Sequence, residues 1–239
     1  MNSWTRYAMV AGVVAGMACG AAQAQVVCKA TTPESKMNEA WWKTRHEQKL
    51  DLVKKGGWEV VFVGDSITQG FEGSAAWKKY YEARKALGLG FSGDRTENVL
   101  WRLDNGEIEG LAPKLVIIMI GTNNAGHRKD PAEQTAEGIK LIVERLRAKM
   151  PNAKILVLGI FPRGPNSQDA CRLLNDKTNE IIAELDDGKS VFFLNINGKL
   201  QAEDGTLSKE VMPDLLHPNA KGQEIWAESM EPMVAKLLK

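Results

Sequence analysis

The stretch VVFVGDSITQGFEGS, Val60 to Ser74, joins an unbroken apolar run to a small polar cluster. Such a run is typical of a strand buried in a parallel sheet. Ser66 then stands at the carboxyl end of the strand, on the turn into a helix. On that turn one serine can supply both a nucleophilic hydroxyl and a backbone N–H for an oxyanion. A helix N-cap is the ordinary structural alternative for a serine in this position.

Further apolar runs alternate with helical patterns, which indicates a parallel sheet with crossover helices. A lead helix is predicted over residues 34–55, and the last helix over residues 219–238. Asp130-Pro131-Ala132-Glu133 predicts an N-cap, a proline at the first helical position and a capping-box acid for another helix. Five strands are predicted, over residues 58–63, 87–91, 115–120, 154–160 and 191–196. The chain of 239 residues, 44% of them apolar, is long enough for one such α/β domain.

The N-terminal segment has the pattern of a secretory signal peptide. Arg6 precedes an apolar stretch that ends in Ala22-Gln23-Ala24, a small-residue cleavage pattern before Gln25. The apolar stretch is shorter than the roughly 20 residues that a membrane-spanning helix needs. We therefore expect residues 1–24 to be a signal peptide, residues 25–239 to form one α/β domain, and the protein to be exported, either periplasmic or secreted.

The charge balance limits the expected partners. Without Arg6 the count of Lys and Arg falls from 31 to 30, which equals the 30 Asp and Glu. A neutral chain with interspersed signs has no basic surface for nucleic acid and no polybasic patch for a membrane, and no later segment is apolar enough for stable membrane insertion. A small molecule or a glycan is the expected partner. Cys28 and Cys171 remain in a compartment that permits a disulfide, and the sequence leaves open whether they pair.

Polar clusters follow three of the predicted strands, where the ligand sites of open α/β sheets gather. They are Gly64-Asp65-Ser66, Gly93-Asp94 and Gly121-Thr122-Asn123-Asn124. A nucleophilic serine also needs a base, and the chain has three histidines. His46 lies among charged residues and is expected to be solvated, whereas His127 is a reserve base. His217 is the preferred base, because Asp214 three residues earlier can hold its ring in the required tautomer.

Four blocks of sequence resemble the SGNH, or GDSL-like, hydrolases, in the order of that family. They are GDSIT at residues 64–68, the glycine of FSGDRTENVLWRL at Gly93, GTNN at 121–124 and DLLHP at 214–218. Within that superfamily the chain is most similar to the catalytic subunits of intracellular platelet-activating-factor acetylhydrolase and their bacterial relatives. The similarity extends from the lead helix to the last helix.

The resemblance implies a flavodoxin-like three-layer α/β/α sandwich with a five-stranded parallel sheet, and a serine esterase that needs no metal or organic cofactor. By position, Ser66 would be the nucleophile, His217 the base and Asp214 its orienting carboxylate. The oxyanion hole would consist of the backbone N–H groups of Ser66 and Gly93 and the side-chain amide of Asn123. The resembled subunits pair, so a homodimer is an open option. They are also cytosolic, so their substrate and regulatory partners are not carried over to a chain with a signal peptide.

The expected function is therefore removal of short acyl groups, acetyl first among them, from a glycan or another small ester. A short-chain lipid or phospholipid acetylhydrolase is the alternative within the enzymes, and a noncatalytic ligand-binding module of the same fold is the alternative outside them. A glycosidase with Asp65 and Asp94 as its carboxylate pair would leave the serine and histidine without a role. The glycines at 88, 90 and 93 fit G-x-G-x-x-G but fall within a predicted strand, which disfavours a dinucleotide site. Four aromatic residues are candidates either for a pocket lining or for the core: Phe71, Trp77, Trp101 and Phe161.

Overall fold

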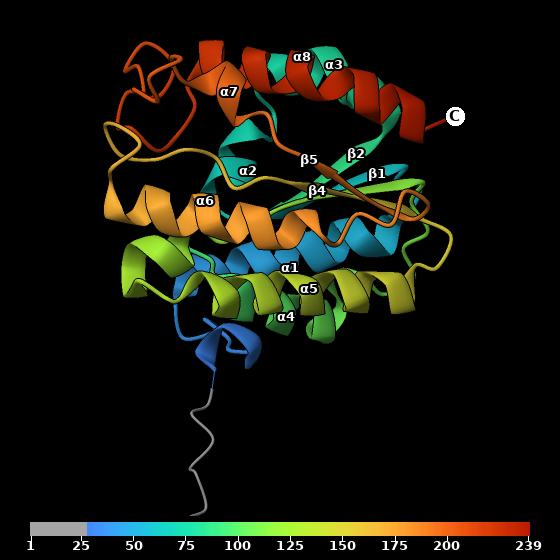
Figure 1. Ribbon diagram of the computed structural model, residues 1–239. Coiled ribbons are helices and arrows are strands. Elements are labelled where there is room, and N and C mark those ends of the chain that lie inside the picture. Colours follow the sequence, from blue (N-terminus) through green and yellow to red (C-terminus); the bar gives the residue numbers. More distant parts are fainter. Residues whose placement is uncertain (1–27) are drawn as a thin grey trace, which may run out of the picture.

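The computed structural model describes residues 28–239, and the predicted signal peptide, residues 1–24, lies outside this part of the chain. Five parallel strands form a sheet in the order β2-β1-β3-β4-β5 (Figure 1). The prediction of a five-stranded parallel sheet is thereby confirmed, and each strand lies within two residues of its predicted start. The strands are β1 (Val60–Gly64), β2 (Ala86–Gly90), β3 (Leu115–Met119), β4 (Lys154–Leu158) and β5 (Val191–Leu194).

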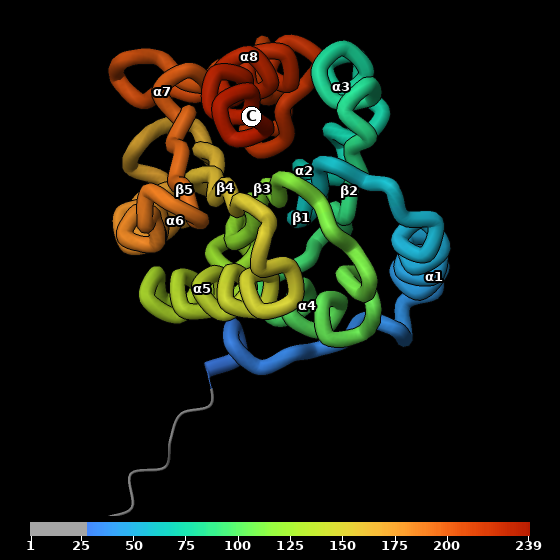
Figure 2. Tube along the Cα trace, turned by 90° about the vertical axis from the view of Figure 1, so that its right-hand side faces the viewer, coloured from blue at the N-terminus to red at the C-terminus, as the bar shows by residue number. Residues whose placement is uncertain are grey.

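Helices cover both faces of the sheet. The longer ones are α1 (Ala40–Lys55), α4 (Thr96–Arg102), α5 (Ala132–Lys149), α6 (Ala170–Ala183) and α8 (Ala220–Leu237). The shorter helices and helical turns are η1 (Lys29–Thr31), α2 (Ser66–Phe71), α3 (Ala75–Tyr80), η2 (Glu82–Arg84), η3 (Leu103–Glu107), η4 (Asn124–Arg128) and α7 (Asn197–Leu200). Seen along the sheet edge, α3 and α8 lie on one side of the strands and α4 and α5 on the other (Figure 2).

The alternation of side chains along β1 divides the core into two layers. Val61 and Val63 pack into the layer under α1, α4, α5 and α6, whereas Val60 and Phe62 pack into the layer under α2, α3 and α8. All five residues of β1 are buried, which explains its unbroken apolar sequence. The expected three-layer α/β/α sandwich is the observed architecture.

The strand order creates a switch point between β1 and β3. From β1 the chain moves outward to β2, whereas from β3 it moves the opposite way to β4 and β5. The loops after β1 and β3 therefore part at the carboxyl edge, which is where open α/β sheets bind ligands. The loop before α8 lies at this same end of the molecule (Figure 1), where the carbonyl of Leu215 accepts a 2.9 Å hydrogen bond from the N–H of Gly164.

Two local predictions are wrong. The lead helix begins at Ala40 rather than at residue 34, because residues 34–39 bond to other segments: the N–H of Glu34 donates to the carbonyl of Glu97 at 3.1 Å. Asp130 is not the N-cap of α5, since its carboxylate accepts hydrogen bonds from Arg128 and Asn124 instead. Tertiary contacts override the local signal in both places.

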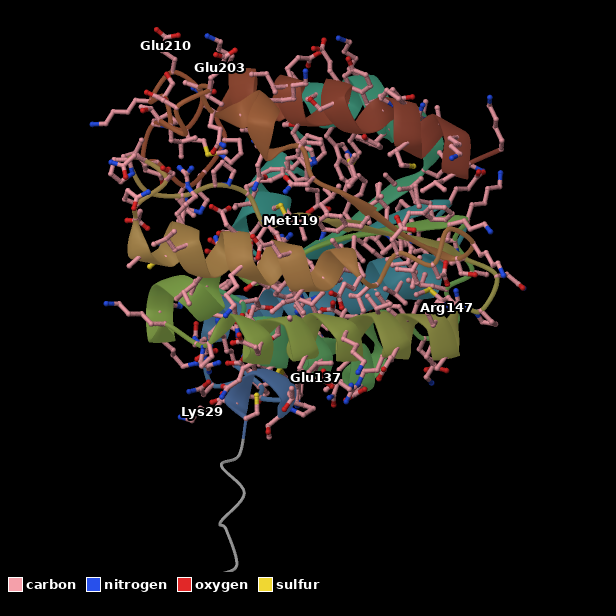
Figure 3. All side chains as sticks on the ribbon, viewed as in Figure 1. Lys29, Met119, Glu137, Arg147, Glu203 and Glu210 are labelled. Carbon is pink, nitrogen blue, oxygen red and sulfur yellow. The ribbon has the colours of Figure 1, made fainter. Side chains whose placement is uncertain are left out.

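Apolar side chains fill the space between the layers, and most charged side chains lie on the surface. Met119, at the end of β3, lies inside the molecule with 3% of its surface exposed, whereas Glu203 and Glu210 project from the rim beside α7 (Figure 3). Within residues 28–239 we find no helix of the length and apolar character that a membrane span requires.

Candidate active site

Ser66 is the first residue of α2, directly after β1. Asp65 takes the N-cap position, and its carboxylate accepts the N–H of Ile67 at 3.0 Å. The alternative that Ser66 caps the helix is therefore wrong, and its hydroxyl is left for another partner. That partner is Nε2 of His217, 2.9 Å from the Oγ of Ser66.

His217 and Asp214 share one tight turn before α8. The carboxylate of Asp214 lies 2.6 Å from Nδ1 of His217 and also accepts the backbone N–H of His217 at 2.7 Å and that of Leu216 at 3.1 Å. Partial burial favours the protonated form of Asp214, but these hydrogen bonds outweigh it and hold the pKa of the carboxyl below its ordinary value. An ionised Asp214 accepts a hydrogen bond from the N–H at Nδ1, so that the unprotonated Nε2 faces Ser66 as an acceptor.

The turn is fixed by its backbone. Leu215 has φ +59°, a left-handed conformation that a branched side chain rarely adopts. Its N–H donates to the carbonyl of Met212 at 2.8 Å, and its carbonyl accepts from Gly164. These bonds impose the conformation that brings the side chains of Asp214 and His217 together.

Three hydrogen-bond donors lie at the ends of β1, β2 and β3. Within residues 28–239, neither the N–H of Ser66 nor that of Gly93 donates to a protein acceptor. Gly93 has φ +70° in the turn closed by the bond from the N–H of Asp94 to the carbonyl of Phe91. The amide nitrogen of Asn123 donates one hydrogen to the carbonyl of Asp94 at 2.9 Å, which orients the side chain and leaves its second N–H for a ligand.

Asp94 anchors the loop that carries Gly93. Its buried carboxylate accepts Nε1 of Trp42 at 2.8 Å and Nε of Arg102 at 2.9 Å. Nζ of Lys36 lies 3.4 Å from the same carboxylate and donates to the carbonyl of Gly93 at 2.8 Å. The position of Gly93 thus depends on Trp42, Lys36 and the buried Arg102, none of which was a candidate site residue from the sequence.

Arg102 ties this loop to the end of β1. It is fully buried, donates to the carbonyl of Gly64 at 3.2 Å and pairs with Glu107 as well as with Asp94. Glu107 in turn lies 2.9 Å from Nδ1 of His46. His46 is only 3% exposed, so the expectation of a solvated histidine is wrong.

His46 is buried because aromatic rings enclose it. Its ring stacks on Trp42 with centroids 5.5 Å apart, and Trp101 lies 5.3 Å away on a tilted plane. Phe71, Trp77 and Phe161 are core residues on the opposite face of the sheet. The aromatic candidates are thus packing residues, with Trp101 half-buried against the network.

Asp65 and Asp94 do not form an accessible carboxylate pair. Asp65 is 1% exposed; burial is the main cause that raises its pKa to about 7, and the nearby charge of Asp94 adds to it. The carboxylate of Asp94 is bonded to Trp42 and Arg102. The glycosidase alternative has no exposed acid to offer at this position. The dinucleotide alternative fails on geometry as well, because Gly88 and Gly90 lie inside β2 and open no helix.

His127, the reserve base, is exposed and lies beside Gly93, whereas the hydroxyl of Ser66 bonds to His217 instead. Partial burial, together with the surrounding charges of Arg95, Lys36 and Arg163, lowers its pKa below the ordinary value. Cys28 and Cys171 are both free thiols. In the part of the chain that the structure covers, no cluster of three or more His, Cys, Asp and Glu side chains is arranged as metal ligands.

Comparison with known proteins gives matches over most of the chain. A family model described as GDSL-like lipase/acylhydrolase matches residues 62–225. The platelet-activating factor acetylhydrolase IB subunit alpha1 of Bos taurus is 35% identical over 211 residues, which cover 88% of this chain and 89% of that protein. The alpha2 subunit of Rattus norvegicus is 34% identical over 198 residues, covering 82% and 85%.

Solved structures share the fold at lower identity. A GDSL-like lipase from Bacteroides thetaiotaomicron superposes with a TM-score of 0.65 at 22% identity and covers 81% of this chain and 97% of that one. An acetylxylan esterase from Geobacillus stearothermophilus superposes with a TM-score of 0.59 at 18% identity, covering 77% and 94%. These likenesses establish the architecture and the order of its elements.

Proposed function

The chain belongs to the GDSL-like lipase/acylhydrolase family and is an ester hydrolase, and on that premise we propose that it removes short acyl groups, acetyl first among them, through Ser66, His217 and Asp214. The observation that carries this assignment is the continuous hydrogen-bonded chain from Asp214 through both ring nitrogens of His217 to the Oγ of Ser66. This is the arrangement that activates a serine hydroxyl.

The proposed reaction has two halves. The Oγ of Ser66 attacks the ester carbonyl carbon and gives its proton to Nε2 of His217. The carbonyl oxygen becomes an oxyanion that accepts the N–H groups of Ser66 and Gly93 and the free amide hydrogen of Asn123. As the tetrahedral species collapses, the C–O bond to the alcohol breaks and His217 returns the proton to the leaving oxygen.

Water then completes the cycle. It gives a proton to Nε2 of His217 and attacks the acyl carbon on Ser66, and the same donors hold the second oxyanion. When the bond to Oγ breaks, His217 returns the proton to Ser66 and the carboxylic acid leaves. Asp214 stabilises the imidazolium in both halves without itself taking the proton.

A glycan or another small ester is the proposed substrate. In support, the aromatic residues that were candidates for an acyl pocket lie in the core or its packing, so they supply no long apolar lining beside Ser66. The names of two similar proteins, an acetylhydrolase and an acetylxylan esterase, also point to acetyl esters. We further propose that residues 1–24 direct export, so that the enzyme meets its substrate in the periplasm or outside the cell.

The test is hydrolysis of p-nitrophenyl acetate, butyrate and octanoate by the protein without residues 1–24, beside Ser66→Ala and His217→Ala. We expect activity that falls with acyl length and is lost in both variants. O-acetylated xylo-oligosaccharides and a short-chain phosphatidylcholine then separate a glycan esterase from a lipid acetylhydrolase. Wild-type protein that is inactive on every ester would favour the noncatalytic binding module instead.

A further inference from the structure

A groove of about 510 Å³ lies between the lead segment and the loop after β2, and Gly93 is part of its wall. The lead segment contributes Lys36 and Trp41 to its walls, and the other side contributes Arg95 and His127. A Cβ placed on Gly93 would point into it, 3.6 Å from Nζ of Lys36 and 3.9 Å from the ring of His127. The groove therefore shares one residue with the proposed oxyanion hole.

Trp41 is the large apolar side chain of this groove. It is 44% exposed, in contrast to the neighbouring Trp42, which is buried. Its Nε1 donates to a carboxylate oxygen of Glu39 at 3.0 Å, which restrains the ring. A restrained aromatic ring with an open face, bordered by hydrogen-bonding groups, suits a ligand that is apolar on one side and polar at its edges.

The other lining side chains are polar and their charges are largely matched. Nε of Arg95 pairs with Glu97 at 2.5 Å. Nζ of Lys36 donates to the carbonyl of Gly93 and pairs with the carboxylate of Asp94. Partial burial, and after it the charges of the nearby cations, lower the pKa of His127. A phosphate would need a cluster of unpaired cations, and the groove walls that residues 28–239 form contain no such cluster.

From this geometry we infer that the groove is a sugar-binding subsite, in which a pyranose or furanose ring stacks on Trp41 and its hydroxyls bond to the polar side chains between Trp41 and Gly93. The inference rests on the proposed esterase function. If the acyl group is as small as acetyl, only the alcohol part of the substrate is large enough to fill the groove. The subsite would then select an O-acylated glycan over a lipid ester by binding its leaving alcohol.

Binding without turnover tests the subsite independently of catalysis. In a Ser66→Ala background, titration calorimetry with acetylated xylotetraose should show a dissociation constant that rises about tenfold on Trp41→Ala, since a stacked ring contributes roughly a factor of ten. Trp41→Phe should recover part of the loss. Leu173→Ala, which removes an apolar side chain of similar exposure from α6, is the matched control and should leave binding unchanged.

The outcomes separate the two proposals. Sugar binding that is indifferent to Trp41→Ala would overturn the subsite, even if the wild type is an active esterase. Binding that depends on Trp41 in a protein that hydrolyses no ester would contradict the esterase and support the subsite. Dibutyryl phosphatidylcholine that binds through Trp41 where the acetylated sugar does not would assign the groove to a phospholipid and overturn the sugar inference.

Discussion

Asn123→Ala removes one of the three proposed oxyanion donors while leaving both backbone donors in place. Asn123 is 5% exposed, and its amide nitrogen makes one bond, to the carbonyl of Asp94, which leaves its second N–H for a ligand. The substitution therefore has two separable effects. The transition state loses a donor, and the folded protein loses one hydrogen bond.

The magnitudes of these two effects differ. Loss of one oxyanion donor typically lowers kcat by roughly 100- to 1000-fold, or about 2.7 to 4 kcal/mol of transition-state stabilisation. Loss of the bond to Asp94 should lower the free energy of unfolding by about 1 kcal/mol. We expect kcat for p-nitrophenyl acetate to fall at least about 100-fold with a much smaller change in KM, because the donor acts on charge that develops during the reaction.

The assay pairs steady-state kinetics with urea unfolding, and Asn179→Ala is the matched control. Asn179 is 4% exposed and bonds to both backbone groups of Ile160, not to any of the three proposed oxyanion donors. Its substitution should cost at least as much stability as Asn123→Ala and change kcat by less than about threefold. A fall in kcat below about fivefold for Asn123→Ala, with the expected loss of stability, would make Asn123 a structural residue only.

Three further substitutions have distinct signatures. Asp214→Asn should lower kcat for p-nitrophenyl acetate at least about 100-fold at nearly constant KM, because an amide no longer sets the tautomer of His217 or stabilises its charge; a loss under about tenfold would contradict this role. Burial raises the pKa of Asp65 to about 7 in the folded protein, so its contribution to stability is lost as pH rises from about 4 to about 7. In urea unfolding, the free energy of unfolding of Asp65→Asn relative to that of the wild type should increase from about pH 4 to about pH 7 and stay constant above it. A difference between the two proteins that does not change with pH would refute the burial effect. Gly90→Ala should lower the free energy of unfolding by more than about 2 kcal/mol, since its methyl would meet the backbone of Gln69 and lie 2.9 Å from the carbonyl of Asp65; unchanged stability in urea would show that α2 and β2 are not in such close contact.

The strands and their common direction were predictable from sequence because apolar runs report burial directly. β3 matches its run almost residue for residue, since both of its faces are covered. The start of α1 was not predictable, because the bonds that keep residues 34–39 out of the helix come from a loop near Gly93 and from α4. The same limit applies to Asp130, whose partners lie in η4 rather than in α5.

The site was predictable where its parts are close in sequence. Asp214 and His217 lie three residues apart, so one turn unites them, and Ser66 is identified by its place at a strand end. Long-range contacts were not predictable from the chain alone. Arg102 was not a candidate from the sequence, yet it is fully buried between two carboxylates and the end of β1.

The burial of His46 also depends on a long-range contact that the sequence does not predict. Its neighbours in sequence are charged, which predicts a solvated ring, but in α1 it shares a face with Trp42 and faces Glu107, 61 residues later. The burial of a single polar residue depends on which partner the fold brings to it. The sequence near the residue does not predict a partner that is distant in the chain.

Whether Ser66 carries the acyl group is tested most directly by covalent trapping. The protein is treated with a fluorophosphonate that reacts with activated serines, digested, and mapped by mass spectrometry. We predict one adduct, on Ser66, that forms far more slowly in His217→Ala and disappears in Ser66→Ala. An adduct on another residue, or equal labelling of the wild type and His217→Ala, would contradict this prediction.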